Sequence, residues 1–351
     1  MKFIHMADMH LGAVVDAGRP WSDTRSKELW DTFTDICDAC DREKADLLLI
    51  AGDLFDRTPL KKELERVAYL LGKLNRAQVV WMAGDSDHLR KKDIYTSFAW
   101  PENVHFLSGE RMDEAYFPFL DTSVVGMSYM SEEITDAIYD DLSPEINDTY
   151  HILLAHGGDE KHVPIDLRKL ATAGFDYVAL GHLHAPRILE REKCAYAGSP
   201  EPLEPDEMAS HGVILGEITS AGTRLKFIPM ARRQYKKVTL YVGDGSDTKM
   251  LLDKLRSVLA AEGMQHIYTV ELTGSSSRTS EIDVEELYTA GNILEIVDCT
   301  HSDYNLDRIK DEHSGDIIGR FISEMQGYPE DDETAKKALD YGVTALLGGL
   351  R

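Results

Sequence analysis

Short apolar runs alternate with amphipathic segments through the first half of the chain. The runs are rich in valine, isoleucine and leucine, as expected of strands that are buried on both faces of a sheet. Residues 22–40 and 60–76 instead carry apolar side chains at helical spacing, with Leu64, Val67 and Leu71 on one face. The predicted strands are KFIHMAD, ADLLLIAGD, QVVWMAGD, SVVGMS, YHILLAH and YVALGHLH. This alternation predicts an α/β fold.

Three parts are expected along the chain. After residue 198 the runs GVILGEI and RLKFIPM follow each other without a helix, which predicts antiparallel strands. The polar stretch ARRQYKK then suggests a boundary, and shorter strand and helix patterns follow it. We expect a large domain at residues 1–232, a small α+β domain at 236–330 and an amphipathic C-terminal helix at 331–351. That last helix either packs on its own domain or docks a partner.

Composition limits the compartment and the cysteine chemistry. No apolar run approaches the roughly 20 residues of a membrane span, and the first residues lack the apolar core of a signal peptide. We therefore expect a cytoplasmic protein without a membrane partner. Cys37 and Cys40 form a CxxC pair, but they continue the apolar spacing of a predicted helix. Core packing is favoured over zinc binding or redox chemistry, because no second pair accompanies them.

The net charge of -24 argues against a protein that binds nucleic acid through an overall basic surface. A substrate that carries phosphate must instead be attracted by bound cations, by a local basic cluster or by a partner protein.

Five short motifs each follow a predicted strand directly. In α/β sheets the loops beyond the carboxyl ends of the strands converge on one crevice, so these side chains can meet. Residues two apart on an extended segment also project to the same side, which suits the pairs D-x-H and H-x-H. The motifs are Asp8-Met9-His10, Gly52-Asp53, Gly84-Asp85, His156-Gly157 and Gly181-His182-Leu183-His184.

Imidazoles and carboxylates together suit manganese, iron or zinc, and a shared carboxylate suits two ions about 3.5 to 4 Å apart. The motifs therefore predict a metal site. The remaining histidines lack this framing and are interpreted as structural or surface residues; they include His5, His105, His151, His162 and His211.

At these motifs the chain resembles the calcineurin-like metallophosphoesterases, whose pattern is D-x-H, GD, GN-H-D, H and GH-x-H. Within that superfamily, FIHMADMHLG, LLIAGDLFDR, LLAHGG, YVALGHLHAP and YAGSP are similar to DNA repair exonucleases of the SbcD and YhaO type. The resemblance implies a four-layer αββα sandwich with two divalent metal ions. Mn²⁺ is the expected metal, and Fe²⁺, Zn²⁺ or Ni²⁺ are the alternatives. It implies that Asp53 bridges an ion held by Asp8, His10 and His184 and an ion held by Asp85, His156 and His182.

The resemblance also implies partners. The small domain would be a capping domain that shapes a groove for DNA. The usual partner of such a subunit is a coiled-coil ATPase of the SbcC or YhaN type, and members of the family often form homodimers.

One motif departs from the family pattern. Where the family has Gly-Asn-His-Asp, this chain has Gly84-Asp85-Ser86-Asp87. A carboxylate at Asp85 can replace an amide as a ligand, whereas the Ser86 hydroxyl is too weak an acid to replace the histidine that protonates the leaving oxygen. Asp87 would then have no histidine to orient in the usual place. His88 is the alternative donor if this loop is rearranged.

The basic run Arg90, Lys91 and Lys92 follows this loop in an otherwise acidic chain. Such runs are commonly solvated surface, and the alternative is that this one steers phosphate groups towards the metal site.

Three functions are compatible with these observations. The first is a dinuclear phosphodiesterase acting on DNA, in which an activated water attacks phosphorus in line and catalysis is weakened at Ser86. The second is a scaffold or regulatory subunit of an ATPase complex that retains the metals and hydrolyses little. The third is a small-molecule phosphatase or cyclic-nucleotide phosphodiesterase, against which the small domain and tail argue.

Overall fold

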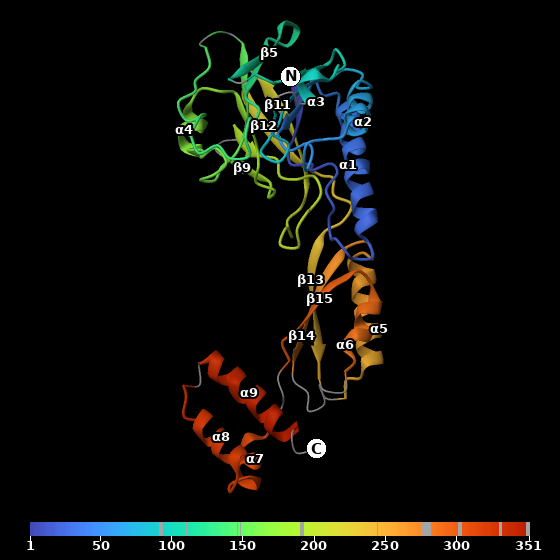
Figure 1. The fold of residues 1–351 in the computed structure, drawn as a ribbon, viewed down its shortest axis with the longest axis vertical. Helices are drawn as coiled ribbons and strands as arrows, with labels where there is room; N and C mark the ends of the chain where they lie inside the picture. Colours follow the sequence, from blue (N-terminus) through green and yellow to red (C-terminus); the bar gives the residue numbers. More distant parts are fainter. Residues whose placement is uncertain are drawn as a thin grey trace. The chain divides into compact units, whose positions relative to one another are not determined.

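The chain divides into two compact units, Met1–Tyr235 and Lys236–Arg351 (Figure 1). No helix in the described part of the chain is long and apolar enough to cross a membrane. The computed structural model describes residues 1–90, 94–109, 111–145, 147, 149–189, 193–243, 245–274, 282–300, 304–329 and 332–348.

The first unit contains two six-stranded sheets. In the first sheet β1 to β4 run parallel. β11 pairs with β1 in antiparallel fashion and β12 pairs antiparallel with β11, as the sequence predicts. Its strands are, in order, β12 (Gly222–Pro229), β11 (Gly212–Thr219), β1 (Lys2–Met6), β2 (Leu47–Ala51), β3 (Gln78–Met82) and β4 (Val104–Phe106).

In the second sheet β6, β7, β8 and β10 run parallel, while β5 and β9 are antiparallel edge strands. Its order is β5 (Asp113–Phe117), β6 (Thr122–Gly126), β7 (Tyr150–His156), β8 (Tyr177–Gly181), β10 (Cys194–Tyr196) and β9 (Arg187–Leu189).

Alternate side chains of β2 belong to different cores. Leu47 and Leu49 pack between the two sheets, whereas Leu48 and Ile50 pack beneath the helices. Successive side chains of a strand point to opposite faces, so a strand covered on both sides is apolar throughout. The continuous run LLLIA therefore reflects the position of β2 inside a layered sandwich.

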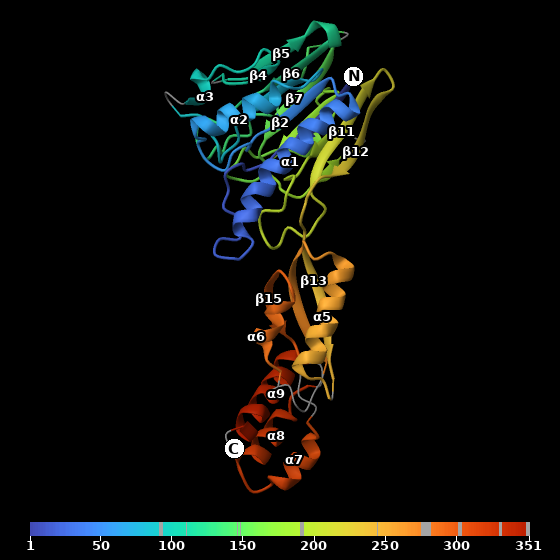
Figure 2. The same cartoon turned by 90° about the vertical axis from the view of Figure 1, so that its right-hand side faces the viewer.

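Helices cover the outer faces of both sheets. Figure 2 shows α1 (Ser22–Glu43) and α2 (Lys61–Leu71) along one face of the first sheet. On the second sheet α4 (Leu167–Thr172) packs Leu170 into a core with Leu153 of β7. The predicted four-layer αββα sandwich is confirmed.

Boundaries and short elements differ from the sequence prediction. α1 continues to Glu43 and α2 stops at Leu71, where Gly72 follows as its C-cap. The structure adds short elements that carry little periodicity of their own, namely β4, β5, β9, β10, the helix α3 (Ile94–Ser97) and the 3₁₀ helix η1 (Pro118–Leu120).

The second unit begins with a three-stranded sheet in the order β13 (Tyr235–Val242), β14 (Ile267–Gly274) and β15 (Ile293–Asp298). The helix α5 (Thr248–Glu262) packs Leu251, Leu255 and Leu259 onto this sheet. The short helices α6 (Val284–Leu287) and η4 (Tyr288–Ala290) complete this part.

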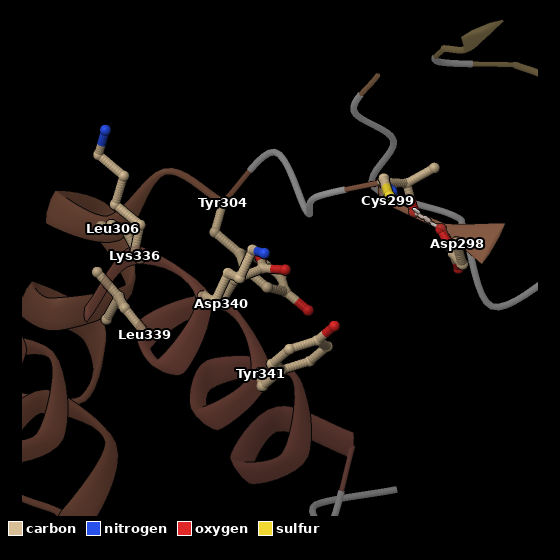
Figure 3. Close-up of a pocket in the computed structure, with 10 residues that line it drawn as sticks. Asp298, Cys299, Tyr304, Leu306, Lys336, Leu339, Asp340 and Tyr341 are labelled. Atoms are coloured by element: carbon tan, nitrogen blue, oxygen red, sulfur yellow. Dashed lines mark hydrogen bonds between the residues drawn. The ribbon is translucent and has the colours of Figure 1, made fainter. Parts of the chain in front are cut away.

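Three helices follow: α7 (Leu306–Glu312), α8 (Ile317–Met325) and α9 (Glu333–Gly348). They share a small core in which Val343 of α9 packs with Ile309, Ile318 and Ile322. A pocket of about 520 Å³ lies beside α9 and includes Tyr341 in its wall (Figure 3). The C-terminal helix thus packs on neighbouring helices and still presents an exposed side.

A buried charge network ties α1 to the end of the first unit. The guanidinium of Arg25 donates to Glu28 and Glu201 at 3.0 and 3.2 Å, and Arg25 and Glu201 have fully buried side chains. Glu201 also accepts from Thr32 Oγ1 at 2.6 Å and from the backbone N–H of Arg232 at 2.7 Å. These bonds hold the segment that leads into β13 against the sandwich.

We predict that Glu201→Ala lowers the free energy of unfolding by about 3 to 5 kcal/mol, because it leaves Arg25 buried with less compensation. The matched control is Asp31→Ala on α1, the helix that carries Arg25. This variant breaks the exposed Lys27–Asp31 pair at 3.9 Å. The control should cost less than about 1 kcal/mol. Denaturant unfolding of both variants measures the difference, and equal losses would contradict the role of the network.

Candidate metal centre

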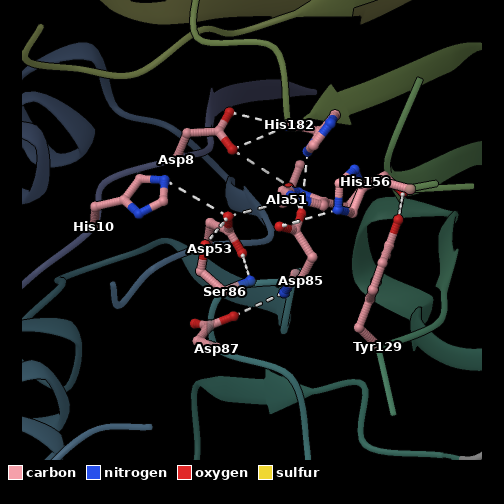
Figure 4. Close-up of polar contacts among 12 residues, drawn as sticks. Asp8, His10, Ala51, Asp53, Asp85, Ser86, Asp87, Tyr129, His156 and His182 are labelled. Atoms are coloured by element: carbon pink, nitrogen blue, oxygen red, sulfur yellow. Dashed lines mark hydrogen bonds and ion pairs between the residues drawn. The ribbon is translucent and has the colours of Figure 1, made fainter. Parts of the chain in front are cut away.

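Seven residues predicted as metal ligands come together beyond the ends of strands in the sandwich. Figure 4 labels all of them except His184. The strands that carry them run parallel within each sheet, so their carboxyl ends lie together. They are Asp8 and His10 after β1, Asp53 after β2, Asp85 after β3, His156 at the end of β7, and His182 and His184 after β8.

The side chains form two groups of three. Asp8, His10 and His184 make one group, and within it the possible ligand atoms all lie within 4.8 Å of one another. Asp85, His156 and His182 make the other under the same limit. In each group two imidazole nitrogens and a carboxylate oxygen converge, which is a donor set for Mn, Fe or Zn.

Asp53 lies between the two groups. Its Oδ2 is 3.6 Å from His10 Nε2 in the first group and 3.7 Å from His156 Nε2 in the second. One carboxylate thus faces both groups at nearly equal distance, the position that a bridging ligand needs.

Hydrogen bonds fix which nitrogen of each histidine faces the centre. His156 Nδ1 donates to the carbonyl of Ala51 at 2.7 Å, so its Nε2 points inward. His10 Nδ1 lies 3.3 Å from Asp56 Oδ1, and its Nε2 is buried with no hydrogen-bond partner among the described residues. A buried nitrogen without a partner fits a metal ion as its missing partner.

The other two histidines are held by carboxylates. His184 Nδ1 lies 2.5 Å from Glu207 Oε1, and His182 Nε2 lies 2.7 Å from Asp159 Oδ2. His182 Nδ1 then faces Asp85 Oδ1 at 3.1 Å. Carboxylates or carbonyls behind ligand histidines orient the ring and raise its basicity, and all four histidines here have one.

The glycines of the motifs leave room for the ligands. A Cβ at Gly84 would lie 2.2 Å from Asp53 Oδ1, and a Cβ at Gly52 would lie 2.2 Å from His156 Nδ1. Gly52 also has φ +89°, a conformation that other residues rarely adopt. A glycine is therefore required before Asp53 and before Asp85, because a larger side chain would collide with a neighbouring candidate ligand.

Four candidate ligands have a left-handed backbone. The φ angles are 52° for Asp8, 47° for His10, 48° for Asp53 and 96° for His182. Such angles are uncommon for residues with a side chain, and they persist only where the surrounding structure enforces them. Their concentration here indicates that the fold is organised to present these side chains.

The carboxylates make the centre strongly attractive to positive charge. Burial works to lower the pKa of His156, but Asp53, Asp85 and Asp8 outweigh it and raise the pKa to about 10. Burial likewise opposes the effect of Asp56, Asp53 and Asp8 on His10, whose pKa still rises to about 9. In the metal-free protein these histidines therefore hold protons where a cation would otherwise sit.

Ser86, which stands where the resemblance to the family leads us to expect a histidine, is bonded to the central aspartate. Its hydroxyl donates to Asp53 Oδ2 at 2.9 Å and its backbone N–H donates to Oδ1 at 3.0 Å. Ser86 thus acts on the carboxylate between the two groups.

Asp87 has hydrogen-bond partners of its own, although from the sequence we expect it to have no histidine to orient in the usual place. It is buried and accepts from the backbone N–H groups of Phe55 and Gly84 and from Tyr95 Oη, at 3.1, 2.8 and 3.0 Å. It therefore ties the loop after β3 to the loop after β2.

The alternative donor and the basic run lie beside this loop. His88 Nδ1 is 2.8 Å from the backbone carbonyl of Asp85, so its ring folds back on its own loop. Arg90 is exposed, and Lys91 and Lys92 lie outside the described residues. A proton-donor role for His88 and a phosphate-steering role for the basic run stay predictions.

Four residues that orient or border the centre were not predicted from the sequence: Asp56, Asp159, His162 and Glu207. His162, interpreted as structural or surface, forms a further group with Asp159 and His182 in which possible ligand atoms lie within 4.8 Å of one another. Only Asp56 had a usable signal, because it follows Asp53 closely in GDLFDR. The others act through contacts between distant loops.

Two curated relatives are similar to the chain. It is 27% identical over 248 residues to an uncharacterized metallophosphoesterase, YhaO, of Bacillus subtilis, covering 65% of this chain and 60% of that protein. It is 26% identical over 287 residues to the DNA double-strand break repair protein Mre11 of Aeropyrum pernix, covering 74% of this chain and 68% of that protein. The match thus spans less than two thirds of YhaO.

A crystal structure of a dimetal phosphatase from Danio rerio matches with a TM-score of 0.41 and 12% identity, over 67% of this chain and 99% of that chain. The family described as calcineurin-like phosphoesterase matches residues 1–186, which is more than half of the chain. With its two converging groups of histidine and aspartate, the chain belongs to the calcineurin-like phosphoesterases, hydrolases of phosphate esters that depend on two metal ions.

Proposed function

We propose that this protein is a two-metal phosphodiesterase that acts on DNA. The observation that carries the proposal is the position of Asp53, whose Oδ2 lies 3.6 and 3.7 Å from histidine nitrogens of the two groups. The similarity to a DNA double-strand break repair protein supports DNA as the substrate.

In this proposal one ion is held by Asp8, His10 and His184, the other by Asp85, His156 and His182, with Asp53 shared. Manganese is the proposed metal, because the donors are mixed imidazoles and carboxylates. When bound, the two ions supply the positive charge that stabilises phosphoryl transfer and a water of lowered pKa. The chain's own part is to orient the ligands, through Asp56, Asp159, Glu207 and the carbonyl of Ala51.

The leaving oxygen receives less help. General acid catalysis typically contributes about 10²- to 10⁴-fold, and the Ser86 hydroxyl is bonded to Asp53 and is a weak acid. Slow turnover of DNA is the expected result. The same observation favours the second candidate, a metal-bearing scaffold that hydrolyses little.

The proposed partners are argued from the net charge of the chain and from the helices and sheet of the second unit. With a net charge of -24, the chain needs its metal ions, a basic run at Arg90 to Lys92, or a partner to attract DNA. We propose that a coiled-coil ATPase binds the three-helix group of α7 to α9, and that the small sheet domain caps a groove for DNA. Formation of a homodimer is part of the same proposal.

Metal binding should release protons. At pH 7 the raised pKa values of His10, about 9, and His156, about 10, keep both rings protonated in the metal-free protein. Each ring must lose a proton to bind metal, so about two protons should leave per chain, and metal affinity should rise with pH. Calorimetric titration of Mn²⁺ in buffers of different ionisation enthalpy measures this release.

The same titration tests the shared carboxylate. Wild type should bind two ions, and Asp53→Asn should weaken both binding events. A heat that does not depend on the buffer would contradict the protonated histidines. A stoichiometry of one ion would rule out the dinuclear mechanism.

Comparing two substrates with different leaving groups distinguishes a missing general acid from a missing nucleophile. With Mn²⁺, wild type should cleave bis(p-nitrophenyl) phosphate readily and end-labelled DNA slowly, because nitrophenolate leaves almost unaided. Ser86→His should raise the rate on DNA by about 10- to 1000-fold and change the aryl ester rate much less. Ser131→His, at an exposed serine of the same unit, is the control.

Rapid cleavage of DNA by wild type without a gain in Ser86→His would refute the loss of the acid, and His88→Ala would then test the relocated donor. No cleavage of either substrate by metal-loaded wild type would favour the scaffold.

The exposed side of α9 should contribute to partner binding. Tyr341 is 69% exposed on this helix, and Tyr341→Asp should weaken binding of the coiled-coil ATPase by about tenfold or more, as expected for an aromatic anchor. Tyr69→Asp on α2, where the tyrosine is 61% exposed, is the control. A pull-down titration measures both, and equal affinities would remove α9 from the interface.

A further inference from the structure

His162 borders the second group of candidate ligands without belonging to it. Its Nε2 is 3.9 Å from Asp85 Oδ2, and its ring centroid is 4.6 Å from that of His182. The side chain is 20% exposed, so the ring touches both the centre and the solvent. The ring is therefore placed to contact a molecule bound next to the second group.

Asp159 fixes the orientation of His162. Its carboxylate oxygens lie 2.8 and 3.0 Å from His162 Nδ1, and the carboxylate also accepts the backbone N–H of His162 at 3.0 Å. The same carboxylate faces His182 Nε2 at 2.7 Å. Asp159 therefore holds a ligand of the second group and the neighbouring histidine in one arrangement.

The loop that presents His162 is tightly constrained. Val163 is fully buried with φ +38°, an outlier for a β-branched residue. A Cβ at Gly157 would lie 2.4 Å from the carbonyl oxygen of His162, and that oxygen accepts from Gly158 N–H at 2.8 Å. Such strain persists only where the surroundings enforce it, and here it fixes the ring beside the centre.

The Ser86 hydroxyl is bonded to Asp53 and is therefore directed at the shared carboxylate. His88 and His162 each have Nδ1 bonded within the chain, to the carbonyl of Asp85 and to Asp159. What distinguishes His162 is that its Nε2 lies 3.9 Å from Asp85 Oδ2 of the second group and makes no hydrogen bond to any residue that the structure describes.

We propose that His162 Nε2 contacts the substrate phosphodiester at the second group, on the side of the oxygen that leaves, and that Asp159 is its positioning residue. The inference rests on the proposed function. In the hydrolysis a water oxygen bonds to phosphorus, one ester P–O bond breaks, and the water's proton ends on the leaving oxygen. Because Nδ1 donates to Asp159, Nε2 donates only from the imidazolium form of the ring, and in that form His162 stabilises the charge on the leaving oxygen as the bond breaks.

The test compares His162→Ala and His162→Gln with wild type in the Mn²⁺-loaded full chain. His162→Ala should lower kcat on DNA by about 10- to 100-fold, the effect of losing a hydrogen bond to a charged group, and change cleavage of bis(p-nitrophenyl) phosphate less than about threefold. His162→Gln keeps a side-chain N–H donor and should recover part of the loss. His151→Ala, on β7 and hydrogen-bonded to Asn147, is the control.

Binding of inorganic phosphate to the Mn²⁺-loaded chain separates this inference from the proposed function. If wild type cleaves neither substrate, the proposed function fails, but His162→Ala should still weaken phosphate binding by about tenfold. Unchanged phosphate affinity in both His162 variants would overturn the inference. So would the loss of one bound metal ion, because His162 would then be a ligand. If His162→Ala fails to fold, His162→Gln decides by the same measurements.

Discussion

The mutual repulsion of three aspartates at the ends of parallel strands is the constraint around which the centre is arranged. Asp8 and Asp53 are almost fully buried, and His156 lies within 4.0 Å of a carboxylate oxygen of Asp8, Asp53 and Asp85. Buried carboxylates are costly unless cations or hydrogen-bond donors compensate them. In the metal-free protein the histidines do so by holding protons, which explains why the pKa values of His10 and His156 rise despite burial. In the proposed function the same histidines become ligands when metal replaces those protons.

Much of the fold was predictable because its signals are local. A strand covered on both faces must be apolar throughout, so β1, β2, β3, β7 and β8 were readable as runs, and the motif that follows each run fixed its end. The short strands β4, β9 and β10 were not, since three residues carry no periodicity and form a strand only when a neighbour pairs with them. Gly72 ends α2 earlier than the apolar pattern suggested.

In the candidate metal centre, too, some residues could be predicted from the sequence and others could not. Candidate ligands were predictable from their place after strands, but their orienting partners were not. Glu207 reaches His184 from 23 residues along the chain, and Asp159 reaches His182 across the same separation. Asp87 illustrates the limit of reasoning from a motif. The family pattern gives this aspartate the role of orienting a histidine that this chain lacks, whereas its carboxylate accepts hydrogen bonds from the backbone N–H groups of Phe55 and Gly84. Its place in the motif is explained by loop geometry, whether or not a histidine precedes it.

The two departures from the family motif both reduce what the centre offers the substrate: Asp85 lowers the positive charge, and Ser86 removes help for the leaving oxygen. Three carboxylates against two divalent ions leave a single positive charge, where an amide at Asp85 would leave two. The centre should therefore hold its ions more tightly and attract phosphate less. Ser86 directs its hydroxyl to Asp53 and so supports the shared carboxylate instead of the leaving oxygen. In the proposed function a centre built this way favours metal retention over turnover, and the proposed contact of His162 with the leaving oxygen would then have the larger influence on the rate that remains.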